Sequence, residues 1–134
     1  MTESAPLPIM VVDDDQAILE IFEEMFAQTN FRIVPFNNGS DAVRAAHQDK
    51  FPIAFIDLFM PGMNGLELLI ELRKIQPELM AVMISGFRNE SLLEQALRAG
   101  AYTYLYKPLG RPDIMGVMLK CLRKLGLGEY SGDA

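Results

Sequence analysis

The sequence is poor in cysteine, in positive charge and in long apolar runs, and each shortage excludes a class of protein. A single cysteine, Cys121, leaves no partner for an internal disulfide and no spacing for a zinc site, so a reducing cytoplasm is the expected location. Twelve lysines and arginines against eighteen acidic residues give a formal net charge of −6, which argues against direct binding of nucleic acid. No apolar run approaches the length of a membrane span, and residues 1–8 lack the basic start and apolar core of a secretory signal.

What the sequence does contain is enough apolar material for one domain. The chain has 134 residues, half of them hydrophobic, which is the size of a single domain with its own core. We expect the domain to span residues 9–125, with an N-terminal tail at 1–8 and a C-terminal tail at 126–134. Cys121 is expected to be a small buried hydrophobe, and the single histidine, His47, to lie on the surface.

Apolar runs of strand length alternate with segments whose apolar residues repeat at helical spacing. The expected strands are residues 9–12, 31–36, 53–56, 80–84 and 102–106. The expected helices are residues 18–26, 41–47, 65–75, 89–99 and 112–125. Pro35 predicts that the second strand lies at an edge or ends early. Because the strands are too apolar to be half exposed, the pattern predicts a parallel sheet covered by helices on both faces, a doubly wound α/β fold.

Polar residues follow four of these strands, at the edge where doubly wound folds collect their functional groups. They are Asp13-Asp14-Asp15, Asp57, Ser85 and Lys107. Adjacent carboxylates repel one another, so a cation must neutralise them, and Mg²⁺ (or Mn²⁺) is the hard ion that prefers such ligands. A cation, a hydroxyl and a lysine together stabilise a transferring phosphoryl group. No Gly-rich phosphate loop is present, so we expect the donor to be something other than a nucleotide held by this chain.

Four motifs occur in order, each at its own strand end. They are Val11-Val12-Asp13-Asp14, the stretch Ile56-Asp57-Leu58-Phe59-Met60-Pro61-Gly62-Met63-Asn64-Gly65, Ile84-Ser85-Gly86, and Lys107-Pro108. In these motifs the chain resembles the receiver domain of bacterial two-component response regulators, from Ile9 to about Leu125. The resemblance implies a flavodoxin-like (βα)5 three-layer sandwich with strand order 2-1-3-4-5. It also implies a cytoplasmic phosphoprotein of phosphorelay signal transduction, which catalyses its own phosphorylation and dephosphorylation and is no enzyme otherwise.

The resemblance assigns a role to each polar residue of the site. Asp57 would be the phosphoacceptor, loaded from the phosphohistidine of a sensor histidine kinase or a phosphotransfer protein. Mg²⁺ would be bound by Asp14 and Asp57 directly, by Asp13 mostly through metal-bound water, and by the backbone carbonyl of Phe59. Asp15 is interpreted from its position alone, either as the cap of the following helix or as a third acidic residue at the rim of the site.

The phosphoryl group itself would be bound by Ser85, Gly86 and Lys107, with Lys107 pairing with Asp57 when the site is empty. Pro61, Gly65 and Pro108 would shape the loops, and the Lys107-Pro108 peptide bond is expected to be cis. A switch would couple Ser85 to Tyr104 and change a readout surface at residues 89–125. That surface would signal to a partner protein or a fused output domain. The protein would act as a monomer or a phosphorylation-dependent homodimer. Direct contact with nucleic acid or membrane is not expected.

Phe59 and Phe87 occupy positions where many members of the family carry polar residues that guide water. Two phenylalanines at these positions predict a site that excludes water and loses its phosphoryl group slowly.

Two other functions remain open. Asp13 and Asp15 match the nucleophile and acid/base spacing of haloacid-dehalogenase-type phosphatases, although the chain lacks the late acidic motif and the cap of that family. Alternatively, the same fold could act as a pseudo-receiver, a docking module without phosphoryl chemistry. The complete set of acidic pair, acceptor, hydroxyl and lysine argues against the second.

Overall fold

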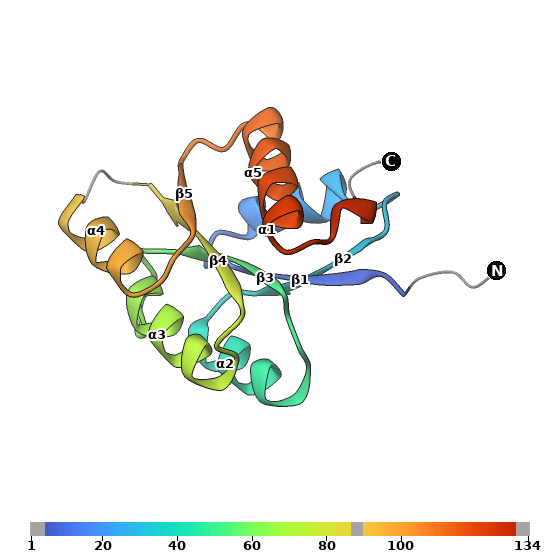
Figure 1. The fold of residues 1–134 in the computed structure, drawn as a ribbon. Helices are drawn as coiled ribbons and strands as arrows, with labels where there is room; N and C mark the ends of the chain where they lie inside the picture. The colour runs from blue at the N-terminus through green and yellow to red at the C-terminus, as the bar shows by residue number, and fades with distance from the viewer. Residues whose placement is uncertain (1–4, 87–89, 131–134) are drawn as a thin grey trace.

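The structure, a computed structural model, describes residues 5–86 and 90–130 and has a five-stranded parallel sheet at its centre (Figure 1). The strands are β1 (Leu7–Val12), β2 (Phe31–Phe36), β3 (Ile53–Asp57), β4 (Met80–Ser85) and β5 (Thr103–Tyr106). The helices are α1 (Gln16–Met25), α2 (Gly39–Gln48), α3 (Gly65–Ile75), α4 (Glu90–Arg98) and α5 (Arg111–Lys124), followed by a short 3-10 helix, η1 (Gly128–Tyr130). The strand order is β2-β1-β3-β4-β5, which confirms the predicted doubly wound, flavodoxin-like fold.

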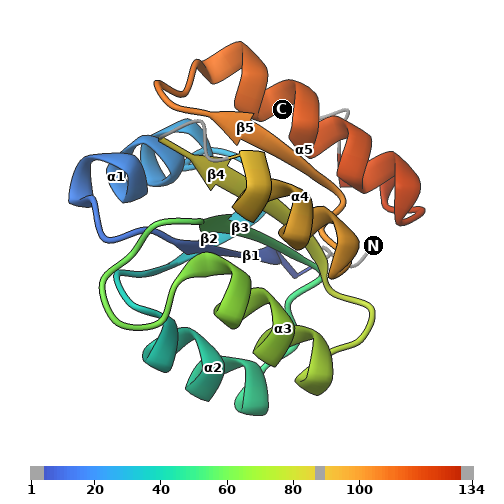
Figure 2. The ribbon, with the colours of Figure 1, turned by 90° about the vertical axis from the view of Figure 1, so that its left-hand side faces the viewer.

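Helices cover both faces of the sheet, with α1 and α5 on one side and α2, α3 and α4 on the other (Figure 2). Successive strand residues point to opposite faces. In β1, Ile9 and Val11 therefore pack under α1 and α5, whereas Met10 and Val12 pack on the side of α2, α3 and α4. All four side chains are fully buried. This two-sided burial is the reason why the strand reads as a continuous apolar run.

The strand β2 lies at one edge of the sheet, as Pro35 predicted. Pro35 stays inside the strand, opposite Val11 of β1, so the strand does not end early. An edge position accommodates proline because its missing N–H is not needed by a second neighbouring strand.

Residues 7–8 and 127–130, which flank the predicted domain, also belong to it. The strand β1 begins at Leu7, two residues before the predicted start. Beyond the predicted end at residue 125, Leu127 and Tyr130 pack against the core beneath α5, and the Tyr130 ring lies 6.0 Å from the ring of Phe31. The Tyr130 hydroxyl donates a hydrogen bond to the carbonyl of Ala5 at 3.4 Å. The segment expected to be a tail therefore forms part of the domain as far as Tyr130.

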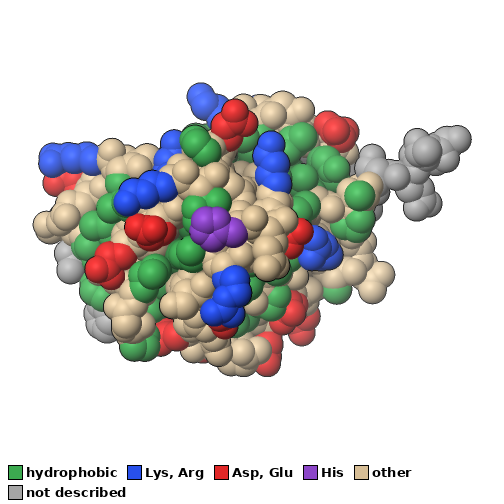
Figure 3. Space-filling view, turned by 90° about the horizontal axis from the view of Figure 1, so that it is seen from below, with side chains coloured by type: hydrophobic (Ala, Val, Ile, Leu, Met, Phe, Trp, Pro, Cys, Tyr) green, Lys and Arg blue, Asp and Glu red, His purple; other side chains and the backbone are tan. Residues whose placement is uncertain are grey.

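The face on the side of α2 and α3 mixes both signs of charge with apolar side chains, and the single histidine is exposed there (Figure 3). This confirms the surface position predicted for His47, and Cys121 is buried as expected. Within the described ranges, no helix is both long enough and apolar enough to cross a membrane.

Candidate functional site

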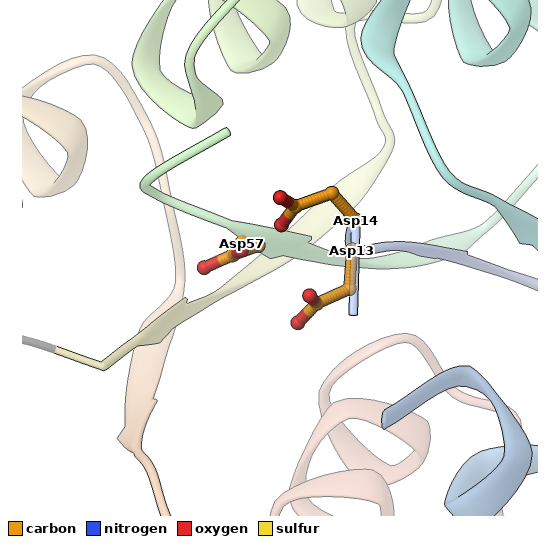
Figure 4. Close-up of side chains that lie close together, drawn as sticks. All are labelled: Asp13, Asp14 and Asp57. Atoms are coloured by element: carbon orange, nitrogen blue, oxygen red, sulfur yellow. The ribbon is translucent and has the colours of Figure 1, made fainter. Parts of the chain in front are cut away.

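Three aspartates meet at the carboxyl edge of the sheet. Asp13 directly follows β1 and Asp57 ends β3, and these strands are neighbours in which Val12 lies opposite Ile56. One carboxylate oxygen from each of Asp13, Asp14 and Asp57 lies within 4.8 Å of the others, and Figure 4 shows the three side chains grouped beyond the two strand ends. Asp13 and Asp57 are buried, whereas Asp14 is exposed and opens the cluster to solvent. The parallel pairing of β1 and β3 thus brings together Asp13 and Asp57, which are 44 positions apart in the sequence.

Lys107 reaches this cluster from the end of β5. Its Nζ lies 3.1 Å from Asp13 Oδ2 and 3.6 Å from Asp57 Oδ2. The sequence-based expectation paired Lys107 with Asp57, and the structure adds the shorter contact to Asp13. Because β4 separates β3 from β5, the lysine must extend past the end of β4, where a Cβ on Gly86 would lie 3.3 Å from Lys107 Cδ. Glycine at that position gives the lysine stem room, and the Lys107-Pro108 bond is cis as predicted.

The cluster holds more negative than positive charge. Burial raises the pKa of Asp57 to about 7, and the nearby negative charge of Asp13 contributes to the rise. Burial also raises the pKa of Asp13, against the lowering effect of a hydrogen bond from the Asp15 amide at 2.9 Å and of Lys107. Partial burial lowers the pKa of Lys107, but the charges of Asp13 and Asp57 outweigh it and raise that pKa overall. The Lys107 side chain therefore stays protonated, and its single positive charge faces two carboxylates and cannot neutralise both.

Among the described residues, one buried carboxylate oxygen of the cluster has an ion-pair contact but no hydrogen bond. Asp13 Oδ2 is buried and accepts no hydrogen bond within residues 5–86 and 90–130, although it lies near the Lys107 ammonium. A buried carboxylate oxygen without a hydrogen bond is costly to maintain. Hard oxygen donors grouped at this spacing, with one exposed member, are the ligands that Mg²⁺ and Mn²⁺ prefer. The residues present therefore fit a divalent cation.

The backbone amide of Phe59 and the backbone carbonyl of Ser85 form hydrogen bonds with Asp57 and Lys107. The amide of Phe59 donates to Asp57 Oδ1 at 3.4 Å, while the Phe59 side chain is 36% exposed. Ser85, the last residue of β4, is buried, and its carbonyl accepts a hydrogen bond from the Lys107 amide at 2.8 Å. Phe87, expected to border the site with Phe59, lies outside the described residues.

The loop after Asp57 requires glycine where it enters α3. A Cβ on Gly65 would lie 2.3 Å from the Asp57 carbonyl oxygen, so no other residue fits without moving the acceptor strand. Gly62 adopts a φ of +79°, a conformation that favours glycine. Asn64 and Glu67 form a capping box, with both hydrogen bonds at 2.9 Å. Sequence reasoning missed this cap, although an asparagine three residues before a glutamate is its usual signal. Pro61 lies exposed in the same loop.

The remaining predicted residues lie around this centre. Asp15 caps α1, since its side chain accepts a hydrogen bond from the Ala17 amide at 3.0 Å, which confirms its interpretation as a helix cap. Tyr104 of β5 is 38% exposed, and its ring contacts the ring of Tyr106 edge-to-face at 5.1 Å. Tyr106 is partly buried against the core on the side of α2, α3 and α4.

Comparison with known proteins gives a consistent result. Residues 9–118 match the family model of the response regulator receiver domain. A response regulator receiver protein of Anaeromyxobacter sp. (strain Fw109-5) is 32% identical over 79% of this chain and 44% of its own length. The DNA-binding transcriptional regulator NtrC of Azospirillum brasilense is 28% identical over 85% of this chain and 24% of its own length. This chain thus spans less than half the length of these two curated relatives.

Solved structures agree with the sequence relatives. The CheY-like response regulator receiver domain protein of Methanospirillum hungatei JF-1 superposes with a TM-score of 0.83 at 26% identity, covering 95% of this chain and 99% of that one. The receiver domain of NtrX from Brucella abortus gives a TM-score of 0.79 at 30% identity over 86% of this chain and 98% of that one. With the family model matched over most of its length and the acidic cluster and lysine in place, this chain belongs to the receiver-domain family of response regulators.

Proposed function

We propose that Asp57 accepts a phosphoryl group from a phosphohistidine of a sensor histidine kinase or a phosphotransfer protein. An Asp57 carboxylate oxygen forms a bond to phosphorus while the bond between phosphorus and the imidazole nitrogen breaks. The electron pair and a proton remain with the leaving imidazole. The observation that carries this proposal is the position of Asp57, a buried carboxylate at the carboxyl edge of the sheet with Asp13 and Lys107 against it.

The chain supplies two means of bringing an anionic phosphoryl group to an anionic carboxylate. The ammonium of Lys107, 3.6 Å from Asp57, offsets the repulsion on approach and would follow the phosphoryl oxygens once they arrive. Asp13, Asp14, Asp57 and the Phe59 carbonyl would hold Mg²⁺ (or Mn²⁺). When bound, that ion supplies positive charge to the carboxylates and to the phosphoryl oxygens. Ser85 and Gly86, at the end of β4, would donate to the same oxygens.

The proposal is tested by incubating the chain with acetyl phosphate and Mg²⁺ and measuring its intact mass. Wild type should gain one phosphoryl group, and chelation of the metal with EDTA should prevent the gain. Asp57→Asn should gain none. Asp15→Asn is the matched control because it changes a neighbouring aspartate that caps α1 and leaves the cap in place. Phosphorylation of Asp57→Asn at the wild-type level would rule out Asp57 as the acceptor.

We further propose that the phosphoryl group switches Ser85 and Tyr104. Ser85 would move toward the phosphoryl oxygens, and Tyr104, now exposed, would turn into the space that Ser85 leaves. The changed surface of α4, β5 and α5 would then signal to a downstream protein or a fused output domain. Nuclear magnetic resonance of the four tyrosine rings, before and after acetyl phosphate, should show a shift for Tyr104 that Ser85→Ala abolishes. An unchanged Tyr104 ring in fully phosphorylated protein would contradict the switch.

Phe59 supports the proposal that the phosphorylated state is long-lived. An apolar side chain two residues beyond Asp57 offers attacking water no hydrogen bond, and we propose the same role for Phe87, two residues beyond Ser85 in the sequence. We expect Phe59→Asn and Phe87→Glu each to shorten the phosphoryl lifetime, measured as the loss of phosphoryl mass after the donor is removed. Ile70→Asn, which makes the same kind of change at an exposed residue of α3, is the control. Equal lifetimes in all four proteins would remove the role given to the phenylalanines.

The two rival functions have less support. A phosphatase of the haloacid-dehalogenase type needs Asp15 as its acid/base, but Asp15 caps α1 through Ala17. A pseudo-receiver would not need the acceptor, the acidic pair and the lysine together. Beyond its own phosphorylation and dephosphorylation, we propose no enzymatic activity for the chain. Its assembly state, monomer or phosphorylation-dependent homodimer, can be measured by light scattering before and after acetyl phosphate.

A further inference from the structure

A basic groove lies at the opposite end of β5 from the acidic cluster. Its walls are Lys120, Arg123 and Lys124 from the last turns of α5, and Tyr102, directly before β5. The hollow between them has a volume of about 320 Å³. All four residues are exposed, and the Tyr102 side chain is 36% accessible. Here these four residues are called the basic groove.

The groove lies in a segment whose charge is opposite to that of the chain as a whole. Residues 98–124 contain six of the twelve lysines and arginines of the chain but one of its eighteen acidic residues, Asp113. This segment therefore carries a formal charge of +5 in a chain whose total is −6. The rest of the sequence, taken together, is acidic, so an anionic partner would be repelled by most of the chain and attracted to those cations of the segment that are not already paired.

The cations of the basic groove have no ion-pair partner in the described parts of the chain. Three other cations of the segment are already engaged: Arg98 with Glu94, Lys107 in the acidic cluster, and Arg111 with Glu24 at 2.8 Å. None of the ion pairs formed among residues 5–86 and 90–130 includes Lys120, Arg123 or Lys124.

A purely structural role explains only part of the groove. Cations in the last turn stabilise the negative end of a helix dipole, and this accounts for Arg123 and Lys124. It does not account for Lys120, which lies a turn earlier, or for an exposed tyrosine that lines the same groove. The Tyr102 amide donates to the Ala81 carbonyl at 2.8 Å, so the backbone that carries this ring is fixed to β4. An exposed aromatic ring that lines the same groove as unpaired cations is a surface suited to binding.

We infer that the basic groove binds an acidic segment of a partner protein, in which carboxylates pair with Lys120, Arg123 and Lys124 and an apolar side chain packs on Tyr102. The groove belongs to the proposed readout surface, so any control of this binding by Asp57 rests on the proposed function, whereas the binding itself does not. Nucleic acid is the less suitable ligand, because its extended backbone would meet the acidic remainder of the chain.

The test uses the whole chain and a fluorescein-labelled twelve-residue peptide of alternating glutamate and leucine, followed by fluorescence anisotropy. A peptide with glutamine in place of glutamate isolates the contribution of charge. The triple variant Lys120→Glu, Arg123→Glu and Lys124→Glu removes the cations of the groove. A matched variant, Arg44→Glu, Lys50→Glu and Lys74→Glu, makes the same change in net charge at exposed cations outside the groove. Tyr102→Ala tests the aromatic contact in a separate sample.

We expect the groove variant to bind the acidic peptide at least tenfold more weakly than the matched variant does. The glutamine peptide should bind wild type as weakly as the acidic peptide binds the groove variant. Raising the salt concentration from 50 to 500 mM should weaken binding of the acidic peptide to wild type and to the matched variant, because both keep the groove cations, and should change binding to the groove variant little. Equal affinity of the two triple variants, or tighter binding of a single-stranded oligonucleotide than of the peptide, would overturn the inference. Intact mass after acetyl phosphate is measured on the same samples, so failure of phosphorylation and failure of peptide binding are separate results.

Discussion

The buried charge of Asp57 should make the metal-free protein less stable than its Asp57→Asn variant. The structure places two buried carboxylates and one exposed carboxylate around a single ammonium, with Asp57 only 2% exposed. Asparagine has nearly the same shape and removes one negative charge. The Asp13–Lys107 pair, at 3.1 Å, would remain and would then be balanced. The substitution that destroys the proposed acceptor is thus expected to stabilise the fold.

The sign and size of the effect follow from the pKa of Asp57, which burial and the charge of Asp13 raise from 3.8 to about 7. In the unfolded chain the carboxyl group loses its proton near pH 4, whereas in the folded chain it keeps the proton until about pH 7. The unfolded state therefore binds fewer protons between these values, and wild-type stability falls as the pH rises from 4 to 7. A tenfold change in an equilibrium is worth about 1.4 kcal/mol, so the full penalty above pH 7 is roughly 4 kcal/mol as an upper bound.

The assay is urea unfolding in EDTA at pH 8 and at pH 4.5, followed by circular dichroism. At pH 8, Asp57→Asn should exceed wild type in the free energy of unfolding by about 2–4 kcal/mol. At pH 4.5 the difference should shrink to less than about 1 kcal/mol, because Asp57 is then protonated in the folded protein. Glu78→Gln removes a charge from an exposed residue outside the cluster and serves as the control. Comparable or lower stability of Asp57→Asn at pH 8, or a difference that does not depend on pH, would refute the electrostatic reasoning.

Two further substitutions test a glycine beside the site and a glutamine that supports the fold elsewhere. Gly65→Ala places a methyl group 2.3 Å from the Asp57 carbonyl oxygen. It should lower the free energy of urea unfolding by roughly 2–3 kcal/mol and slow the uptake of the phosphoryl group. Gly116→Ala, whose added methyl meets nothing within 4 Å, should have neither effect. Gln76→Ala should cost about 2–4 kcal/mol in the same assay, since its side chain makes three hydrogen bonds of 2.7 to 2.9 Å to the backbone of residues 46, 49 and 51. A loss below about 0.5 kcal/mol for Gln76→Ala would show that water replaces these bonds.

Much of the site could be predicted because one geometric rule applies to it. Parallel strands end at the same edge of a sheet, so an aspartate after β1 and another at the end of β3 had to become neighbours. Asp15, two positions after Asp13, is not a member of the cluster. It lies at the start of α1, where a carboxylate caps the helix instead.

Other features depend on distances that no local pattern contains. Lys107 lies closer to Asp13 than to Asp57, a result of the reach of its side chain past β4 and of the space left by Gly86. Gln76 connects backbone groups 25 to 30 residues earlier in the chain, and nothing around it distinguishes it from an ordinary surface glutamine. Tyr130 packs on Phe31 from a segment too short to show any periodicity.

The central claim, that Asp57 and not Asp13 carries the phosphoryl group, is tested most directly by locating the modified residue. Borohydride reduces an aspartyl phosphate to homoserine, and peptide mapping by mass spectrometry then identifies the position. After acetyl phosphate and Mg²⁺, we expect homoserine at position 57 and unchanged aspartate at positions 13, 14 and 15. Homoserine at position 13 would instead support the phosphatase alternative, and an unreduced Asp57 in protein that has gained phosphoryl mass would contradict the account.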